Sequence, residues 1–209
     1  TPMFMPTATP TRTMLSFAGE GETYFIAGDL DRAIEAYRQA VAMDPTNAEL
    51  QADLARIMVY SSTLLTVDAE RLARLNDALD TINKAIEVVP ENSMNHAVKG
   101  FVLDWLSGST ADENERQSLL TQAEQEVIYA IQLDNQNNLA LAYYAEILVD
   151  QQKWIQAEQN IRQALERAPE LMDVHRINGY VQESLGNYNQ AISEYEEAIR
   201  INPNLTFIY

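Results

Sequence analysis

An eight-residue pattern, Ala33-Ile34-Glu35-Ala36-Tyr37-Arg38-Gln39-Ala40, occurs again near the end of the chain as Ala191-Ile192-Ser193-Glu194-Tyr195-Glu196-Glu197-Ala198. A polar residue and a proline follow both copies, as Asp44-Pro45 and Asn202-Pro203. Three further copies keep the same two alanines, at Ala78–Ala85, Ala123–Ala130 and Ala157–Ala164. A pattern that returns along nearly the whole chain is typical of a repeat protein.

Bulky apolar residues flank the first alanine of each copy at helical spacing. One precedes it by three positions and another follows it by four, as Leu30 and Tyr37 do in the first copy and Trp154 and Ile161 in the fourth. Offsets of this kind place the residues on one face of a helix. We therefore expect this stripe, Trp154 included, to lie in the core, where the alanines let a neighbouring helix approach.

A second series of small residues precedes the first and lies within another helical stretch. Its members are Gly21, Ala55, Gly100, Ala145 and Gly179. Each repeat is therefore expected to be a helical hairpin, with a first helix that carries the Gly or Ala and a second helix that carries the paired alanines.

The repeated hairpin pattern resembles the tetratricopeptide repeat family. The resemblance is strongest in Gly21-x2-Tyr24, Gly28, Ala33-x3-Tyr37-x2-Ala40 and Pro45, and again in Gly179, Gly186, Ala191-x3-Tyr195-x2-Ala198 and Pro203. It implies an all-α, right-handed superhelical solenoid of stacked antiparallel helix hairpins over residues 14–205. The expected repeats are about 14–47, 48–92, 93–137, 138–171 and 172–205. Asn135 departs from the pattern where the family has a terminal proline.

The spacing of the two series locates extra residues in two repeats. The first alanines are 45, 45, 34 and 34 residues apart, whereas the small residues of the first helices are 34, 45, 45 and 34 apart. Repeats 2 and 3 must therefore each hold 11 additional residues between their helices. We expect helical extensions at 68–75 and 111–120, the latter opened by the capping box Thr110-Ala111-Asp112-Glu113, that form a ridge. Disordered surface loops are the alternative.

Composition excludes several classes of function. The chain has 209 residues, of which 46% are hydrophobic and 22% charged, as in a soluble globular protein. A net charge of −17 repels phosphate, so we expect no nucleic-acid partner. No apolar run has the length of about 18 residues that a membrane-spanning helix needs, so we expect no membrane insertion here. The absence of Cys excludes disulfides and thiolate metal sites.

The N-terminal residues 1–13 contain three Pro and five Thr, which predicts an extended tether. Because the chain begins with Thr1, we expect it to be part of a longer protein. The tether is compatible with a disordered end and also with a stalk that holds the domain away from an upstream anchor, by compositional analogy with bacterial surface proteins. The localisation therefore stays open between extracytoplasmic and cytoplasmic. Residues 206–209 are the possible start of a further helix or a linker.

Residues that would indicate catalysis, a cofactor or a metal ion are missing. His96 and His175 occupy the same position in repeats 3 and 5, which favours a packing role over a ligand or base. No nucleophile and base pattern accompanies them, and no calcium-loop spacing occurs. We therefore expect no enzyme, no cofactor and no metal site.

The resemblance implies that the first helix of each repeat lines a concave surface that binds a peptide or a partner's helix. Counting along these helices selects Glu22, Phe25, Arg56, Tyr60, Phe101, Asp104, Trp105, Tyr143, Glu146, Asp150, Tyr180 and Glu183, together with Arg176. Acids and aromatic residues dominate this set, which suits a basic and partly apolar partner. Phe101, Tyr143 and Tyr180 could equally pack between repeats, so Trp105 is the main candidate anchor.

These observations predict a non-catalytic protein–protein interaction scaffold that binds its partner in an acidic, aromatic groove. The alternative is a substrate- or partner-capture module of a larger enzyme, for example a protease, whose other domains lie outside this chain. The sequence on either side of the chain would separate the two.

Overall fold

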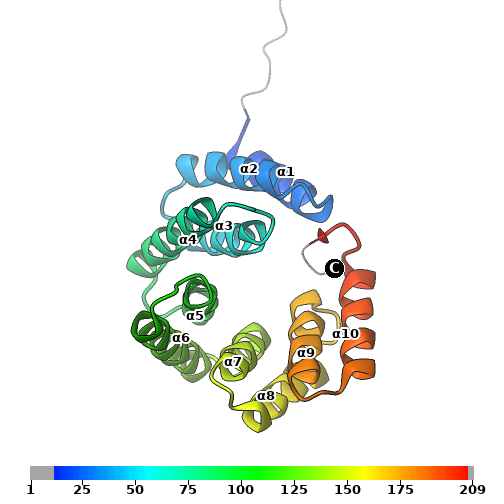
Figure 1. Ribbon diagram of the computed structural model, residues 1–209. Coiled ribbons are helices and arrows are strands. Elements are labelled where there is room, and N and C mark those ends of the chain that lie inside the picture. The colour runs from blue at the N-terminus through cyan, green and yellow to red at the C-terminus, as the bar shows by residue number, and fades with distance from the viewer. Residues whose placement is uncertain (1–11, 207–209) are drawn as a thin grey trace, which may run out of the picture.

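The computed structural model describes residues 12–206, and within this range it contains ten α-helices and no strand (Figure 1). The helices form consecutive antiparallel pairs, arranged one after another around a ring. Their bounds are α1 Met14–Ile26, α2 Leu30–Met43, α3 Ala48–Ser62, α4 Asp68–Val88, α5 Ser93–Ser107, α6 Glu113–Leu133, α7 Asn138–Asp150, α8 Trp154–Arg167, α9 Met172–Ser184 and α10 Tyr188–Ile201. The predicted all-α repeat fold is confirmed.

Small residues on the first helix of each pair allow the second helix to pack closely. A Cβ atom added to Gly21 of α1 would lie 2.5 Å from Cδ2 of Tyr37 on α2, and one added to Gly179 of α9 would lie 2.6 Å from Cε1 of Tyr195 on α10. The glycines and tyrosines therefore occupy complementary space between the helices. This packing explains why the two series recur together along the sequence.

The paired alanines of the second helices are buried as predicted, and each is at most 3% exposed. Leu30, Leu75 and Leu120 of the apolar stripe are buried with them. The expectation for the fourth repeat is wrong, because Trp154 is 45% exposed, and Tyr188 in the fifth is exposed as well. Trp154 and Tyr188 are the first residues of α8 and α10, as the buried Leu30 is of α2, so the position in the repeat does not by itself decide burial.

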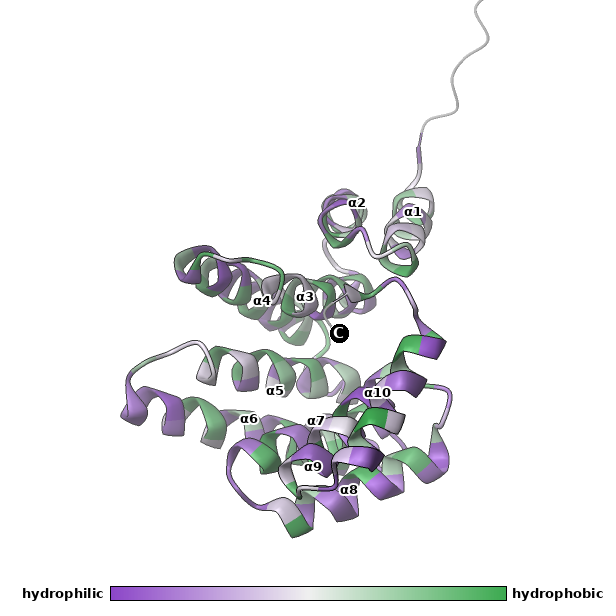
Figure 2. Cartoon of the chain, turned by 45° about the vertical axis from the view of Figure 1, so that its right-hand side comes forward, coloured by the Kyte–Doolittle hydropathy of each residue, from purple (hydrophilic) through white to green (hydrophobic). Residues whose placement is uncertain are grey.

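The extra residues of the second and third pairs lengthen a helix in each. Helices α4 and α6 have 21 residues, whereas α2, α8 and α10 have 14. Figure 2 shows the α3–α4 and α5–α6 hairpins projecting on the same side of the molecule, and the predicted helical extensions are confirmed. The predicted cap of α6 was two residues early, because the side chain of Asp112 accepts from the backbone N–H groups of Asn114 and Glu115.

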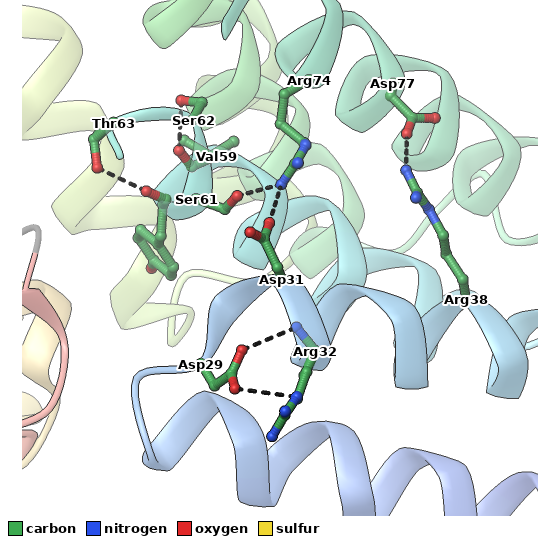
Figure 3. Close-up of polar contacts among 11 residues, drawn as sticks. Asp29, Asp31, Arg32, Arg38, Val59, Ser61, Ser62, Thr63, Arg74 and Asp77 are labelled. Carbon is green, nitrogen blue, oxygen red and sulfur yellow. Dashed lines mark hydrogen bonds and ion pairs between the residues drawn. The ribbon is translucent and has the colours of Figure 1, made fainter. Parts of the chain in front are cut away.

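Polar contacts join the lengthened α4 to the first repeat (Figure 3). Arg74 on α4 donates to Asp31 on α2 over 3.3 Å and to the hydroxyl of Ser61 at the end of α3. Arg38 on α2 pairs with Asp77 one turn further along α4. The first turns of α4 are therefore held against two other helices.

The last described residues return to the first repeat, so the array closes on itself (Figure 1). The side-chain amide of Asn204 donates to the backbone oxygen of Ile26 over 2.9 Å. Leu205 is buried in the same core cluster as the helices. Gly28 has a positive φ of 78°, and a Cβ added there would lie 2.1 Å from the backbone oxygen of Asn204. Closure therefore depends on direct backbone contact at Gly28.

Both ends of the sequence lie partly outside the described residues. The predicted tether of residues 1–13 falls mostly there, although Thr13 caps α1 by accepting from the backbone N–H of Ser16. The possible helix at residues 206–209 also lies outside, apart from Thr206. Among the helices of residues 12–206, none is long and apolar enough to span a bilayer.

Candidate functional site

Contacts between the second and fifth repeats close the centre of the ring. Asp173 on α9 accepts from the hydroxyl of Tyr60 over 2.6 Å and from the guanidinium of Arg56 over 3.2 Å, both of them on α3. Asp173 is only 3% exposed. These partners are 113 and 117 residues apart in the sequence. The first helices thus meet here instead of lining an open groove along their whole length.

Aromatic rings fill the space between the first helices. The rings of Phe101 and Tyr143 stack with centroids 4.4 Å apart, and Tyr60 lies 5.7 Å from Phe101 and 6.1 Å from Phe25. Tyr60, Phe101 and Tyr143 have no exposed surface. The expectation that these three line a groove is therefore corrected: they pack between repeats, because the tight ring brings their helices into contact.

A pocket of about 720 Å³ remains open next to this aromatic cluster. It lies between α5, α7 and α9, with further residues from α10, from the α3–α4 connection and from the first turn of α4. Its walls combine acidic groups, aromatic rings and two arginines. The lining residues are Thr63, Arg71, Asp104, Trp105, Gly108, Ser109, Glu146, Asp150, Arg176, Tyr180, Glu183 and Tyr195.

Arg176 lines the pocket and is paired with Glu146. Its guanidinium donates two hydrogen bonds, of 2.7 and 2.8 Å, to the two carboxylate oxygens of Glu146. The same group lies 5.7 Å from the ring centroid of Phe101 and 5.9 Å from that of Trp105. Such bidentate pairs fix the geometry of both side chains. The positive charge of Arg176 is therefore already matched inside the protein.

Three other carboxyl groups of the pocket are held by no direct ion pair in the described part of the chain, although Arg116 acts on Asp150 through space. Within residues 12–206, Asp104, Asp150 and Glu183 take part in no salt bridge. Tyr180 donates to Asp150 over 2.5 Å, and Tyr195 donates to Glu183 over 3.0 Å. The pocket is therefore an acidic site whose charge is stabilised mainly by hydroxyl groups.

Burial controls the protonation of Asp104. Desolvation raises the pKa of this carboxyl well above its ordinary value, and the negative charges of Asp150 and Glu146 raise it further. Burial also raises the pKa of Asp150, while the hydrogen bond from Tyr180 opposes that change. Because the negative charge of Asp150 raises the pKa of Asp104, the pair favours a state that holds a single proton.

The structure brings together about half of the predicted site residues. Asp104, Trp105, Glu146, Asp150, Tyr180 and Glu183 line the pocket, as does Arg176. Arg56 and Tyr60 instead hold the centre closed, and Glu22 lies at the first repeat, where it accepts from Tyr37 over 3.2 Å. Phe25 packs in the aromatic cluster.

Sequence reasoning missed Asp173, Tyr195 and the loop residues of the pocket. The sequence does mark Asp173 as unusual, because it is acidic where three of the four equivalent positions hold the apolar residues Leu15, Met94 and Leu139. Tyr195 was assigned to the packing stripe, and it does pack against Gly179 while its hydroxyl reaches the pocket.

The two histidines lie away from the pocket and make equivalent contacts. His96 contacts Glu126 through Nδ1 over 2.6 Å and the backbone oxygen of Pro90 through Nε2 over 2.8 Å. His175 contacts Glu194 over 2.7 Å and the backbone oxygen of Pro169 over 2.8 Å in the same way. In the described part of the chain, no cluster of His, Asp and Glu has an arrangement that could hold a metal ion.

Comparisons with known proteins agree with this architecture. Sequence models of the tetratricopeptide repeat match residues 21–59 and 144–205. The crystal structure of TTC0263, a thermophilic TPR protein of Thermus thermophilus, is similar with a TM-score of 0.75 and 17% identity, over 93% of this chain and 95% of that one. The structure of MamA 41-end from Desulfovibrio magneticus RS-1 is similar with a TM-score of 0.50 and 10% identity, over 92% and 97%.

A comparison with curated protein sequences finds no match. The likenesses to solved structures concern the fold. The sequence matches cover the first and last parts of the array, so the number of five repeats and their boundaries stay predictions.

Proposed function

This chain is a tetratricopeptide repeat protein, and we propose that it binds a basic, partly apolar segment of a partner protein in the pocket between α5, α7 and α9. Proteins of this family are helical scaffolds for protein interactions and are generally non-catalytic. The observation that carries the proposal is the excess of unpaired acidic groups beside exposed aromatic surface at a place where the inner helices leave space.

Charge supports a basic partner. Asp104, Asp150 and Glu183 border the pocket, and the positive charge of Arg176 is matched by Glu146. The whole chain carries a net charge of −17, which favours encounter with a positively charged segment. Lysine or arginine side chains of a partner would therefore be attracted to the pocket and oriented there.

Aromatic surface supports an apolar contribution. Trp105 is partly exposed at the pocket, while its ring packs edge-on against Phe101 with centroids 5.7 Å apart. The tryptophan is thus held rigidly and still presents surface to a ligand. Rigid, half-buried tryptophans commonly supply a large share of binding energy at interfaces. Tyr180 and Tyr195 add aromatic surface beside it.

A peptide library tests the proposal. Basic peptides with aromatic or aliphatic residues, and acidic peptides of the same length, are screened against the whole chain at low and high salt. We expect basic peptides to dominate and their affinity to fall with salt. Replacing Trp105 by Ala should weaken binding by about 2 kcal/mol or more, because the rigid contact area is lost.

The second tryptophan provides a matched control. Trp154 is exposed at the start of α8 and does not line the pocket, so Trp154→Ala should bind these peptides like the unaltered protein. Circular dichroism checks that both variants keep their helices. A predominance of acidic peptides, or equal binding by Trp105→Ala and Trp154→Ala, would contradict the proposal.

A further inference from the structure

Asp104 is a buried carboxyl group with an unused acceptor. The residue is 2% exposed, yet it borders the pocket, and its Oδ1 atom is buried without a hydrogen-bond partner. Buried polar atoms are nearly always satisfied in native proteins, because an unpaired one costs the free energy of its desolvation. An unsatisfied acceptor at the edge of an open pocket points to a donor that arrives with a ligand.

The nearby carboxyl groups indicate that the missing hydrogen-bond donor of Asp104 carries a positive charge. The negative charges of Asp150 and Glu146 both act on Asp104 and raise its pKa. Two carboxylates that act on each other in a buried site repel, so one of Asp104 and Asp150 keeps a proton while the pocket is empty. A ligand with a positive charge would replace that proton and also supply the missing donor.

We propose that the pocket seats the cationic head of a single lysine or arginine side chain on Asp104 and Asp150, beside Trp105, and that seating it releases the proton held by the two aspartates. This inference rests on the proposed function, and it specifies which chemical group of the partner is recognised and that a proton is released on binding. The exchange is balanced in charge, because one cation enters as one proton departs. It needs no oxidant, metal ion or other reactant.

Among the described residues, the basic side chains around Asp104 and Asp150 form no direct ion pair with them and so do not take the place of a cationic ligand. Arg176 is held by Glu146 and lies near Asp173, and Arg71 donates to Asp68 and to the backbone oxygen of Leu65. Arg116 acts on Asp150 through space. The titratable and charged groups that surround Asp104 and Asp150 are Arg71 on α4, Arg116 on α6, Glu146 on α7, Arg176, Tyr180 and Glu183 on α9, and Tyr195 on α10.

The sign of the pH dependence follows from the exchange. At pH values between the ordinary pKa of an aspartate and the raised pKa of Asp104, the empty pocket holds a proton that the cation must displace. Affinity for a cation should therefore rise with pH in this range, by up to about tenfold per pH unit, and level off at higher pH. A ligand that is merely attracted to a negative surface would show a shallower dependence.

Small probes test the site without a known partner. The chain contains two tryptophans, so the Trp154→Phe variant leaves Trp105 as its single tryptophan, whose emission is followed with excitation that tyrosine does not absorb. n-Pentylammonium, n-pentylguanidinium and 1-pentanol are titrated into this variant at several pH values. Calorimetry in two buffers of different ionisation enthalpy counts the protons released. We expect the cations to change the emission of Trp105 at concentrations at least tenfold lower than pentanol does, with release of up to one proton.

Variants of the pair decide the outcome. Asp104→Asn keeps the shape of the side chain and should weaken cation binding at least tenfold at high pH, while it also removes the proton release. Glu170→Gln, an exposed carboxyl group outside the pocket, should keep the release. Equal affinity for pentylammonium and pentanol, or unchanged proton release in Asp104→Asn, would overturn the inference. If that variant does not fold, Asp150→Asn is measured against the same criteria.

Failure of the inference differs from failure of the proposed function. If basic peptides bind through Trp105 without proton release and independently of Asp104, the proposed function holds and the inference is wrong. If the small cations bind with proton release while no basic peptide binds, the cation site holds and the proposed peptide function is wrong. Peptides in which norleucine replaces lysine or citrulline replaces arginine identify the side chain that is seated.

Discussion

Gly100 shows how a single residue limits the distance between two helices. A Cβ atom at this position on α5 would lie 2.4 Å from Cγ1 of Val127 and 3.0 Å from the backbone oxygen of Ala123, both on α6. The valine could rotate, but the backbone of α6 would have to move. Glycine is therefore required here by packing, although it is an unfavourable residue within a helix.

Gly19 on α1 offers a matched control, because a Cβ added there meets nothing within 4 Å. We expect Gly100→Ala to lower the free energy of unfolding by about 1–3 kcal/mol through overpacking. Gly19→Ala should instead raise it by about 0.5–1 kcal/mol, since alanine is the better helix former. Urea denaturation of both variants measures the difference. A gain in stability for both would mean that α5 and α6 are less tightly packed than described.

The equivalence of repeats predicts which residues share a position but not how exposed each one is. Tyr60 and Trp105 are 45 residues apart and equivalent in their first helices. Tyr60 is fully buried because Asp173 lies opposite and accepts a hydrogen bond from its hydroxyl, whereas Trp105 lines the pocket. The counting that selected Trp105, Asp150 and Tyr180 for the site therefore also selected Tyr60, Phe101 and Tyr143, which lie inside.

At the scale of the element, the arithmetic of repeat spacing predicted where α4 and α6 are lengthened. The exact start of each helix depended on competition between nearby capping groups. Thr110 was expected to cap α6, but it donates instead to the side chain of Glu115, and Asp112 accepts from two backbone N–H groups. Aspartate and threonine are both good caps, so the sequence alone does not choose between them.

The cap should control the stability of the extension of α6. Its first two turns are largely exposed, so few packing contacts hold them. Asp112→Ala should cost about 1 kcal/mol locally, and amides 117–120 should exchange with solvent about fivefold faster. Hydrogen exchange followed by mass spectrometry measures this. Helix α8, which begins without a side-chain cap, should be unchanged and is the internal reference. Complete exchange of 117–120 at the earliest time in the unaltered protein would show that the extension is not a stable helix.

At the scale of the whole molecule, closure of the ring could not be predicted from the sequence. Curvature accumulates from small rotations between successive repeats, and no spacing pattern reports a contact between residues more than 100 positions apart. Asp173 with Arg56 and Tyr60, and Asn204 with Ile26, are contacts of this kind. They convert a surface that was expected to be an open groove into a ring with an acidic pocket between α5, α7 and α9.

Closure can be tested at two glycines that share a conformation. Gly28 and Gly186 have φ values of 78° and 79°, so alanine at either position should cost about 1–2 kcal/mol for the left-handed backbone. A Cβ at Gly186 meets nothing within 4 Å, whereas one at Gly28 would collide with the backbone oxygen of Asn204. The difference between the two variants therefore isolates the contact that closes the ring.

We expect Gly28→Ala to separate the turn around Asn204 from the first repeat, and Gly186→Ala to leave it in place. Because the chain lacks cysteine, spin labels can be attached at Ala27→Cys and Thr206→Cys, two exposed positions on either side of the closure. Double electron–electron resonance should give a narrow distance distribution for the labelled parent and for Gly186→Ala, and a broader, longer one for Gly28→Ala. The same narrow distribution in all three, with equal losses of stability, would mean that the contact at Gly28 does not hold the ring closed.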